Sequence, residues 1–254
     1  MKFFDAFLGL GRTNRGTPDM PLTQEQALKV MDRFDVARAL VFHYFARDGD
    51  VELGNEKLGT LVKSRRLLKV WGIETAAVAE EAAGDFVRRG LAAGAKAFMV
   101  NPLVGNVRPS RSVCLKQIAG VLQKRRVPLL LVYGHPHSAE QVIDWYELAD
   151  FCNGFPRLPV IAWEFRTRGN RTFFDAMAAT KNLIVPVSNL WQHRMIPQVA
   201  RSFGAHRLVF SAGLPGLFPG SMQAPLLYSG LPKEDIALIA RGTIERLIGE
   251  ADYG

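Results

Sequence analysis

The segment PLTQEQALKVMDRFDVARALVFH, residues 21–43, holds one complete helix-strand unit, and the same alternation recurs along the chain. Thr23 precedes Gln26 by three residues, so the hydroxyl and the amide form the pattern of a capping box at the start of a helix. The apolar run from Arg38 to His43 predicts a buried strand directly after this helix. Between them, apolar residues recur at helical spacing, at Ala27, Val30, Met31 and Phe34.

Eight short apolar runs occur along the chain, each followed by a helical pattern. The runs are apolar on both faces, which is typical of parallel strands covered by helices. Their number matches an α/β fold with a closed (β/α)8 TIM barrel, and we expect residues 1–254 to form this single domain. The predicted strands are Phe3 to Leu10, Arg38 to His43, Leu67 to Trp71, Ala97 to Asn101, Val127 to Tyr133, Pro159 to Glu164, Leu183 to Val187 and Leu208 to Ala212.

Two further helices have predicted starts. Ser138 precedes Gln141 by three residues, which predicts a second capped helix that continues through Tyr146 and Leu148. The final helix is expected to open at Leu231-Pro232, because proline suits a first helical turn. We expect this helix to pack against the barrel through Ile236, Ile239, Ile244 and Leu247.

The 254 residues carry a formal net charge of +8. No helix-turn-helix, RNP-type or finger motif accompanies the charge, so we expect no nucleic-acid partner. No uncharged apolar run approaches the roughly 18 residues of a membrane span, and Asp5 comes too early for a signal peptide. We therefore expect a cytoplasmic protein without a membrane partner, with Cys114 and Cys152 as packed, reduced thiols.

Three parts of the sequence belong to one match that spans nearly the full chain in a consistent order. They are residues 21–43, the stretch from Arg89 to Pro102, and the stretch FGAHRLVFSAGLP from Phe203 to Pro215. The three resemble, respectively, a helix-strand signature, the fourth strand and the eighth strand of the amidohydrolase-related family. This resemblance implies a TIM barrel with metal-dependent hydrolase or decarboxylase ancestry, and barrels of this family often dimerise, so a homodimer is a possible assembly.

The resemblance also implies where a divalent ion would lie: two histidines on strand 1, one histidine each on strands 5 and 6, and an aspartate on strand 8. In this sequence the matching residues are Phe7, Gly9, Val132, Glu164 and Gly213. A zinc site needs three or more N, O or S ligands around the ion. Since Glu164 alone could bind metal, we expect the inherited metal site to be lost and the protein to use no cofactor.

A relocated metal site is the main alternative. His135 and His137 follow strand 5, His43 ends strand 2 and Glu164 ends strand 6, all on the face where barrel chemistry occurs. These four residues would hold zinc or manganese in an active hydrolase or decarboxylase. For Glu164 two roles stay open: a buried acid paired with Arg166, or a catalytic general base or anchor for a ligand cation.

The loops that follow the predicted strands are rich in arginine, whose planar fork suits carboxylate and phosphate. The ligand candidates at this mouth are His43, His135, His137, Arg166, Arg168, Phe7 and Trp163, with Phe7 as the expected plug of the barrel top. Internal salt bridges would leave less of the arginine charge for a ligand. The nine arginines are Arg12, Arg15, Arg47, Arg108, Arg111, Arg166, Arg168, Arg171 and Arg194.

The leading hypothesis is a barrel that has lost its ancestral metal and binds a small anionic ligand or a protein, or acts without metal. The alternatives are the active metal-dependent hydrolase or decarboxylase with a relocated site, and a non-catalytic interaction protein with a basic surface that contacts an acidic partner.

Overall fold

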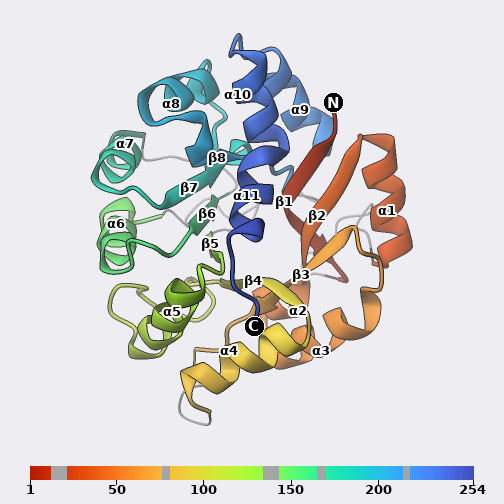
Figure 1. Ribbon diagram of the computed structural model, residues 1–254, viewed down its shortest axis with the longest axis vertical. Helices are drawn as coiled ribbons and strands as arrows, with labels where there is room; N and C mark the ends of the chain where they lie inside the picture. The colour runs from red at the N-terminus through yellow and green to blue at the C-terminus, as the bar shows by residue number, and fades with distance from the viewer. Residues whose placement is uncertain (13–21, 76–80, 134–142, 165–169, 214–217) are drawn as a thin grey trace.

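The strands form a barrel in the computed structural model, which describes residues 1–12, 22–75, 81–133, 143–164, 170–213 and 218–254. Within these residues, eight parallel strands follow one another around the ring in sequence order (Figure 1). This arrangement confirms the predicted (β/α)8 TIM barrel. The strands are β1 Phe3–Leu10, β2 Val36–His43, β3 Leu67–Gly72, β4 Ala95–Val100, β5 Leu129–Tyr133, β6 Val160–Glu164, β7 Leu183–Pro186 and β8 Leu208–Val209.

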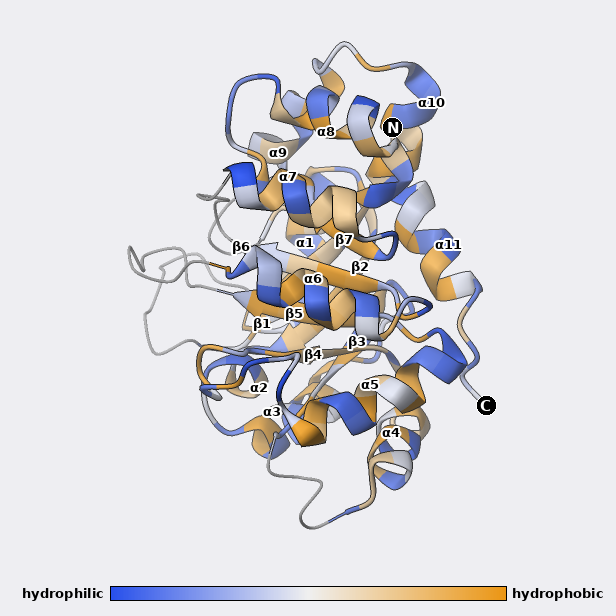
Figure 2. Cartoon of the chain, turned by 90° about the vertical axis from the view of Figure 1, so that its left-hand side faces the viewer, coloured by the Kyte–Doolittle hydropathy of each residue, from blue (hydrophilic) through white to orange (hydrophobic). Residues whose placement is uncertain are grey.

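Helices surround the strands and turn their apolar sides toward them (Figure 2). No described helix has both the length and the apolar character needed to cross a bilayer. The helices are α1 Gln24–Arg33, α2 Tyr44–Asp48, α3 Val51–Leu61, α4 Ala83–Ala92, α5 Val113–Arg125, α6 Trp145–Gly154, α7 Asn170–Ala179, α8 Met195–Phe203, α9 Pro219–Leu227, α10 Lys233–Ala237 and α11 Thr243–Gly249, with shorter turns η2 Val187–Asn189, η3 Ala205–Arg207 and the π-helical η4 Leu238–Gly242.

Side-chain caps fix the starts of α1 and α6. At α1 the predicted capping box is confirmed: the Gln26 amide N–H donates to Thr23 Oγ1 at 3.4 Å, and the Thr23 N–H donates to Gln26 Oε1 at 3.2 Å. At α6 the prediction is wrong. The described chain is not helical at Ile143 and Asp144, and the Glu147 N–H donates to Asp144 Oδ1 at 3.1 Å, so the helix starts after Asp144. Ser138 itself lies outside the described residues.

The last helix of the chain closes the end of the barrel at which the strands begin (Figure 1). The sequence predicts one regular helix from Pro232 onward, but α10 and α11 are joined by the π-helical turn η4. In that turn the Ile239 carbonyl accepts a hydrogen bond from the Phe210 N–H at 2.8 Å, so the helix is tied to the chain after β8. Ile244 and Leu247 pack into the barrel interior, as predicted.

Apolar side chains fill the inside of the barrel, as they do in other TIM barrels. The interior cluster is separate from the larger core between strands and helices. The side chains of this cluster are almost fully buried, so they form a packed core inside the barrel. The cluster contains Phe4, Ala6, Phe7, Leu40, Phe42, Tyr44, Ala46, Val70, Ala97, Met99, Leu130, Val132, Ile161, Trp163, Ile184 and Val209 besides the two α11 residues.

A buried carboxylate lies where the first and last strands meet. β8 is shorter than predicted, and beyond it the contact with β1 depends on two bonds: the Ala6 N–H donates to the Phe210 carbonyl at 2.9 Å, and the Ala212 N–H donates to Asp5 Oδ1 at 3.3 Å. The Phe7 N–H also donates to Asp5 Oδ1, at 3.0 Å. The register of β1 against β2 shifts between Asp5 and Leu8, so consecutive residues Ala6 and Phe7 both face the interior.

Candidate functional site

Three aromatic rings occupy the centre of the barrel near the ends of β1, β2 and β6. The Phe7 ring lies between those of Phe42 and Trp163, with centroid distances of 4.4 Å on both sides and interplanar angles of 28° and 24°. Phe7 is 2% exposed and Trp163 1%. Each such pair contributes about 0.5–1.5 kcal/mol beyond the area that it buries. We call Phe7, Phe42 and Trp163 the aromatic stack.

A tyrosine ring fills the space that a side chain at position 9 would need. A Cβ atom built on Gly9 would lie 2.5 Å from Cζ and 2.7 Å from Oη of Tyr44. Tyr44 is buried, packs edge-on against Phe42, and burial raises the pKa of its phenol far above the ordinary value. A histidine at position 9 would therefore require Tyr44 to move.

Position 213, where the resemblance implies an aspartate, shows the same arrangement. Gly213 has a φ of +69°, a conformation that favours glycine, and an added Cβ would lie 2.9 Å from Cζ2 of Trp163. Val132 is fully buried in the interior cluster. Apolar packing thus surrounds four of the five positions that the resemblance assigns to metal ligands.

Glu164 is the fifth of these positions. It ends β6, where its backbone pairs with Tyr133 of β5. The description covers the backbone of this residue and not its side chain. Its two predicted roles, as a structural acid or as a catalytic group, remain predictions.

His43 is used in the local structure at the end of β2. The Phe45 N–H donates to His43 Nδ1 at 3.1 Å, which caps the short helix α2. Burial, with a smaller effect from Lys57, lowers the pKa of the imidazole, so the ring is neutral at pH 7. A neutral imidazole has one nitrogen with a free lone pair, and here that nitrogen accepts the capping bond. His43 would have to give up this bond to bind a metal ion.

The remaining predicted ligands cannot be placed together. His135, His137, Arg166 and Arg168 all lie outside the described residues. Within the described part of the chain, no group of three or more His, Cys, Asp or Glu side chains is arranged to hold a metal ion.

The arginines at the mouth divide into two described groups. Arg47 is buried and makes two bonds to Asp48, at 2.5 Å and 2.6 Å, while its guanidinium lies 4.5 Å from the centroid of Tyr44. Its charge is neutralised internally. The second group is exposed and makes no ion pair within the described residues; its members are Arg12, Arg108, Arg111, Arg171 and Arg194. Arg15 lies outside the description.

A small hollow adjoins Arg47 at the ends of β3 and β4. It has a volume of about 240 Å³, and polar residues on its wall include Glu74, Thr75 and Asn101. The Asn101 side-chain amide donates to the Arg47 carbonyl at 3.1 Å, so this wall is tied to α2.

Sequence reasoning missed two residues that shape the site. Phe42 was not singled out, although its alternation with Leu40 along β2 places both on the inner face. Asp5 was noted only for its charge. Burial raises the pKa of its carboxyl to about 7, against the opposing hydrogen bonds from Phe7, Ala212 and Ser211. The signal in the sequence is its position, because Asp5 lies inside the apolar run from Phe3 to Leu10 that is predicted to be buried on both faces.

This chain is similar in structure to solved proteins. No protein-family model matches the chain, and no curated protein matches it. An uncharacterised TIM-barrel protein from Bordetella bronchiseptica is similar, with a TM-score of 0.75, 16% identity and coverage of 98% of this chain and 99% of that chain. A putative amidohydrolase from Staphylococcus aureus has a TM-score of 0.76, 14% identity and coverage of 98% and 100%.

A decarboxylase is among the similar structures. 2,6-Dihydroxybenzoate decarboxylase, solved in complex with 2,6-dihydroxybenzoate, has a TM-score of 0.73, 16% identity and coverage of 98% of this chain and 99% of that chain. At such identities the likeness establishes the fold alone. The resemblance inferred from the sequence is confirmed at that level: the structural neighbours of this chain are amidohydrolase-family TIM barrels and decarboxylases.

Proposed function

We propose that this chain is an amidohydrolase-like barrel that functions without the divalent ion of its ancestry and binds a small anionic molecule at the carboxyl ends of its strands. The observation that carries the proposal is the aromatic stack with the Tyr44 ring beside it. These side chains fill the interior where the resemblance implies metal ligands.

The chemistry of the donor set supports the absence of metal. A zinc ion needs three or more ligand atoms at about 2.0–2.3 Å and an open position for water or substrate. Phe7, Gly9, Val132 and Gly213 offer no ligand atom from a side chain. Among the described alternatives, His43 has its acceptor nitrogen committed to the cap of α2.

The charge of the mouth supports an anionic ligand. Exposed arginines without ion pairs in the described residues follow β1, β4 and β7, and one stands in α7 after β6. In addition, the buried indole N–H of Trp163 has no hydrogen-bond partner in the described chain, and it lies beside Gly213. A buried donor of this kind is stabilised when it gains an acceptor atom, from a ligand or from water.

Benzoate is a suitable probe, since a similar structure carries a hydroxylated benzoate. We expect calorimetric titration to show binding of benzoate and no binding of benzyl alcohol, which lacks the charge. Arg166→Ala, at the predicted mouth, is expected to weaken benzoate about tenfold, the usual effect of losing a charge-assisted hydrogen bond. Arg65→Ala is the matched control, because Arg65 is exposed at the opposite end of the barrel.

Two results would contradict this function. One is the absence of benzoate, phosphate and acetate binding at millimolar concentration. The other is binding of benzoate only after zinc or manganese is added, which would favour the relocated metal site of His43, His135, His137 and Glu164. Co-purification of an acidic protein without any effect of small anions would instead favour the interaction protein.

A further inference from the structure

A groove between α8 and α9 lies outside the barrel interior. Its first part is a cavity of about 600 Å³ between the segment that follows β7 and helix α9. Its second part has a volume of about 640 Å³ and runs along α8. Arg194, Pro197 and Ser229 line both parts, so the two form one continuous groove. Each volume lies in the range of about 300–1,000 Å³ that small-molecule sites occupy.

One part of the groove offers apolar surface. Leu190, Trp191, Met222 and Tyr228 line it. Trp191 is 38% exposed, and its indole N–H donates to the Ser188 carbonyl at 2.6 Å, which fixes the orientation of the ring. An aromatic side chain held in this way gives a flat surface against which another ring can stack.

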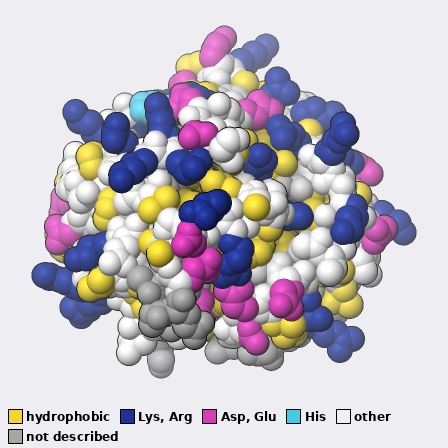
Figure 3. Space-filling model, turned by 60° about the horizontal axis from the view of Figure 1, so that its bottom comes forward, with side chains coloured by type: hydrophobic (Ala, Val, Ile, Leu, Met, Phe, Trp, Pro, Cys, Tyr) yellow, Lys and Arg dark blue, Asp and Glu magenta, His cyan; other side chains and the backbone are white. Residues whose placement is uncertain are grey.

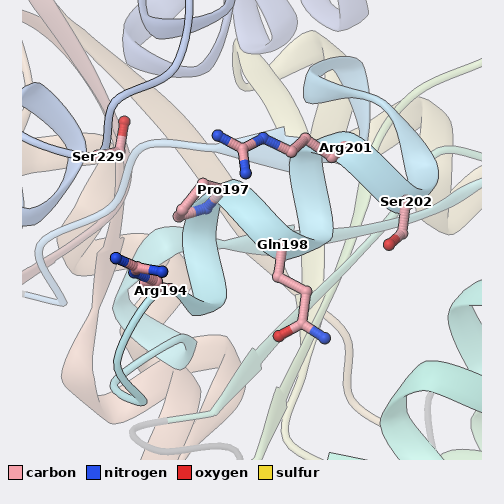
Figure 4. A pocket seen from close by; sticks show the side chains of 6 residues that line it. All are labelled: Arg194, Pro197, Gln198, Arg201, Ser202 and Ser229. Atoms are coloured by element: carbon pink, nitrogen blue, oxygen red, sulfur yellow. The ribbon is translucent and has the colours of Figure 1, made fainter.

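The other part of the groove is cationic. Arg194 and Arg201 are seven positions apart, about 10 Å along the helix, and their side chains extend on the side of α8 that faces Ser229, with Pro197 between them (Figure 4). Gln198 and Ser202 also line this part of the groove (Figure 4). The described lining contains no Asp or Glu, and neither arginine makes an ion pair within the described residues.

The backbone holds Arg194 at the start of α8. Its φ of +59° and ψ of +13° place it in the left-handed region, which residues other than glycine rarely adopt. No side chain caps the helix at this position. Arg194 therefore lies at the positive end of the helix dipole, where an anion is favoured.

We propose that the groove is a second binding site, for a phosphate monoester with an aromatic body. The ring of the ligand lies against Trp191 and Tyr228, and the phosphate, which carries up to two negative charges, is held by Arg194 and Arg201 with the Ser229 hydroxyl nearby. The groove is built from the segments that follow β7 and β8. Arg194 is the one residue that the groove shares with the arginines of the mouth. The aromatic stack and the other predicted ligand candidates take no part in the described lining, so the groove is a second site outside the barrel interior.

The probe for this site is phenyl phosphate, titrated by calorimetry into the wild-type chain. We expect one equivalent to bind. Arg194→Ala and Arg201→Ala should each weaken binding about tenfold, and Arg194→Lys should restore only part of the loss because lysine lacks the bidentate fork. Arg65→Ala, an exposed arginine outside the groove, should leave binding unchanged.

A second variant separates the aromatic body from the charge. Trp191→Ala should weaken phenyl phosphate and leave inorganic phosphate unaffected. Circular dichroism melts establish that each variant is folded. Both arginines are exposed, and substitutions at exposed positions change stability by only about 0.5 kcal/mol. Benzoate binding lost on Arg166→Ala but kept in Arg194→Ala would show that the mouth and the groove are different sites.

The inference would be overturned if phenyl phosphate did not bind at millimolar concentration, or if its affinity were the same in the wild type, Arg194→Ala and Arg201→Ala.

Discussion

At the scale of single residues, Asp5 sets the direction of Phe7. Its carboxylate accepts the N–H of the residue two positions later, and the register of β1 shifts at the same point. As a result Phe7 faces the interior and stacks between Phe42 and Trp163. The sequence shows directly that Phe7 and Gly9 stand where the resemblance implies two histidines. It does not predict that Tyr44 fills the space at Gly9, because that contact depends on how α2 follows β2.

The space around Gly9 gives a first prediction. Gly9→Ala places a methyl group within 2.5 Å of Tyr44 Cζ and should lower the free energy of unfolding by about 1–3 kcal/mol, as overpacking does. In a Tyr44→Ala background the same substitution should have a much smaller effect. Gly120→Ala is the control, because a Cβ there meets nothing within 4 Å and the position lies inside α5. Equal effects of Gly9→Ala in both backgrounds, measured by urea unfolding, would contradict the packing described here.

The buried Asp5 carboxyl gives a prediction about pH. Burial raises its pKa from 3.8 to about 7 in the folded chain, so between these values the folded state keeps a proton that the unfolded state has released. This retained proton stabilises the folded state by an amount on the order of 4 kcal/mol. The stabilisation is fully present below about pH 4 and is lost as the pH rises through about 7.

Asp5→Asn should remove this dependence, because the amide oxygen still accepts from the backbone and carries no charge. We therefore expect the stability of the wild type, measured against Asp5→Asn by urea unfolding, to fall between about pH 4 and about pH 8. A constant difference between the two proteins over that range would show that Asp5 does not titrate there.

At the scale of elements, the strands are predicted closely and the starts of helices less so. Buried parallel strands leave continuous apolar runs in a sequence, and each of the eight predicted strands overlaps the observed one. The start of α6 could not be predicted because Ser138 and Asp144 are both good cap residues, and local sequence does not decide between them. The π-helical turn η4 depends on the contact between Ile239 and Phe210, which are far apart in sequence.

The cap of α6 can be tested directly. Asp144→Ala removes the acceptor of the Glu147 N–H and should lower the free energy of unfolding by about 1 kcal/mol. Asp144→Asn keeps a side-chain oxygen that can accept the same bond, so the free energy of unfolding should change by only about 0.3 kcal/mol. If thermal unfolding showed the two variants to be equally destabilised, the effect would come from the lost charge and not from the cap.

At the scale of the whole molecule, the apolar side chains and the unpaired charges of the described residues lie in different parts of the barrel. Lys and Arg side chains are spread around the face shown in Figure 3 and alternate with Asp and Glu, so the net charge of +8 does not gather into one patch there. The interior is apolar instead, and exposed arginines follow several strands at the mouth. The composition predicts the sign of the net charge. It does not predict which arginines can bind a ligand, because some are neutralised by ion pairs, as Arg47 is by Asp48.

The content of bound metal tests the central claim most directly. The chain is purified without chelator, incubated with zinc or manganese, passed through a desalting column, and its metal is measured per chain by mass spectrometry. The aromatic stack and the Tyr44 ring predict far less than one equivalent of either metal, and no change in His43→Ala or Glu164→Gln. One equivalent of zinc or manganese in the wild type, lost in Glu164→Gln, would contradict the account.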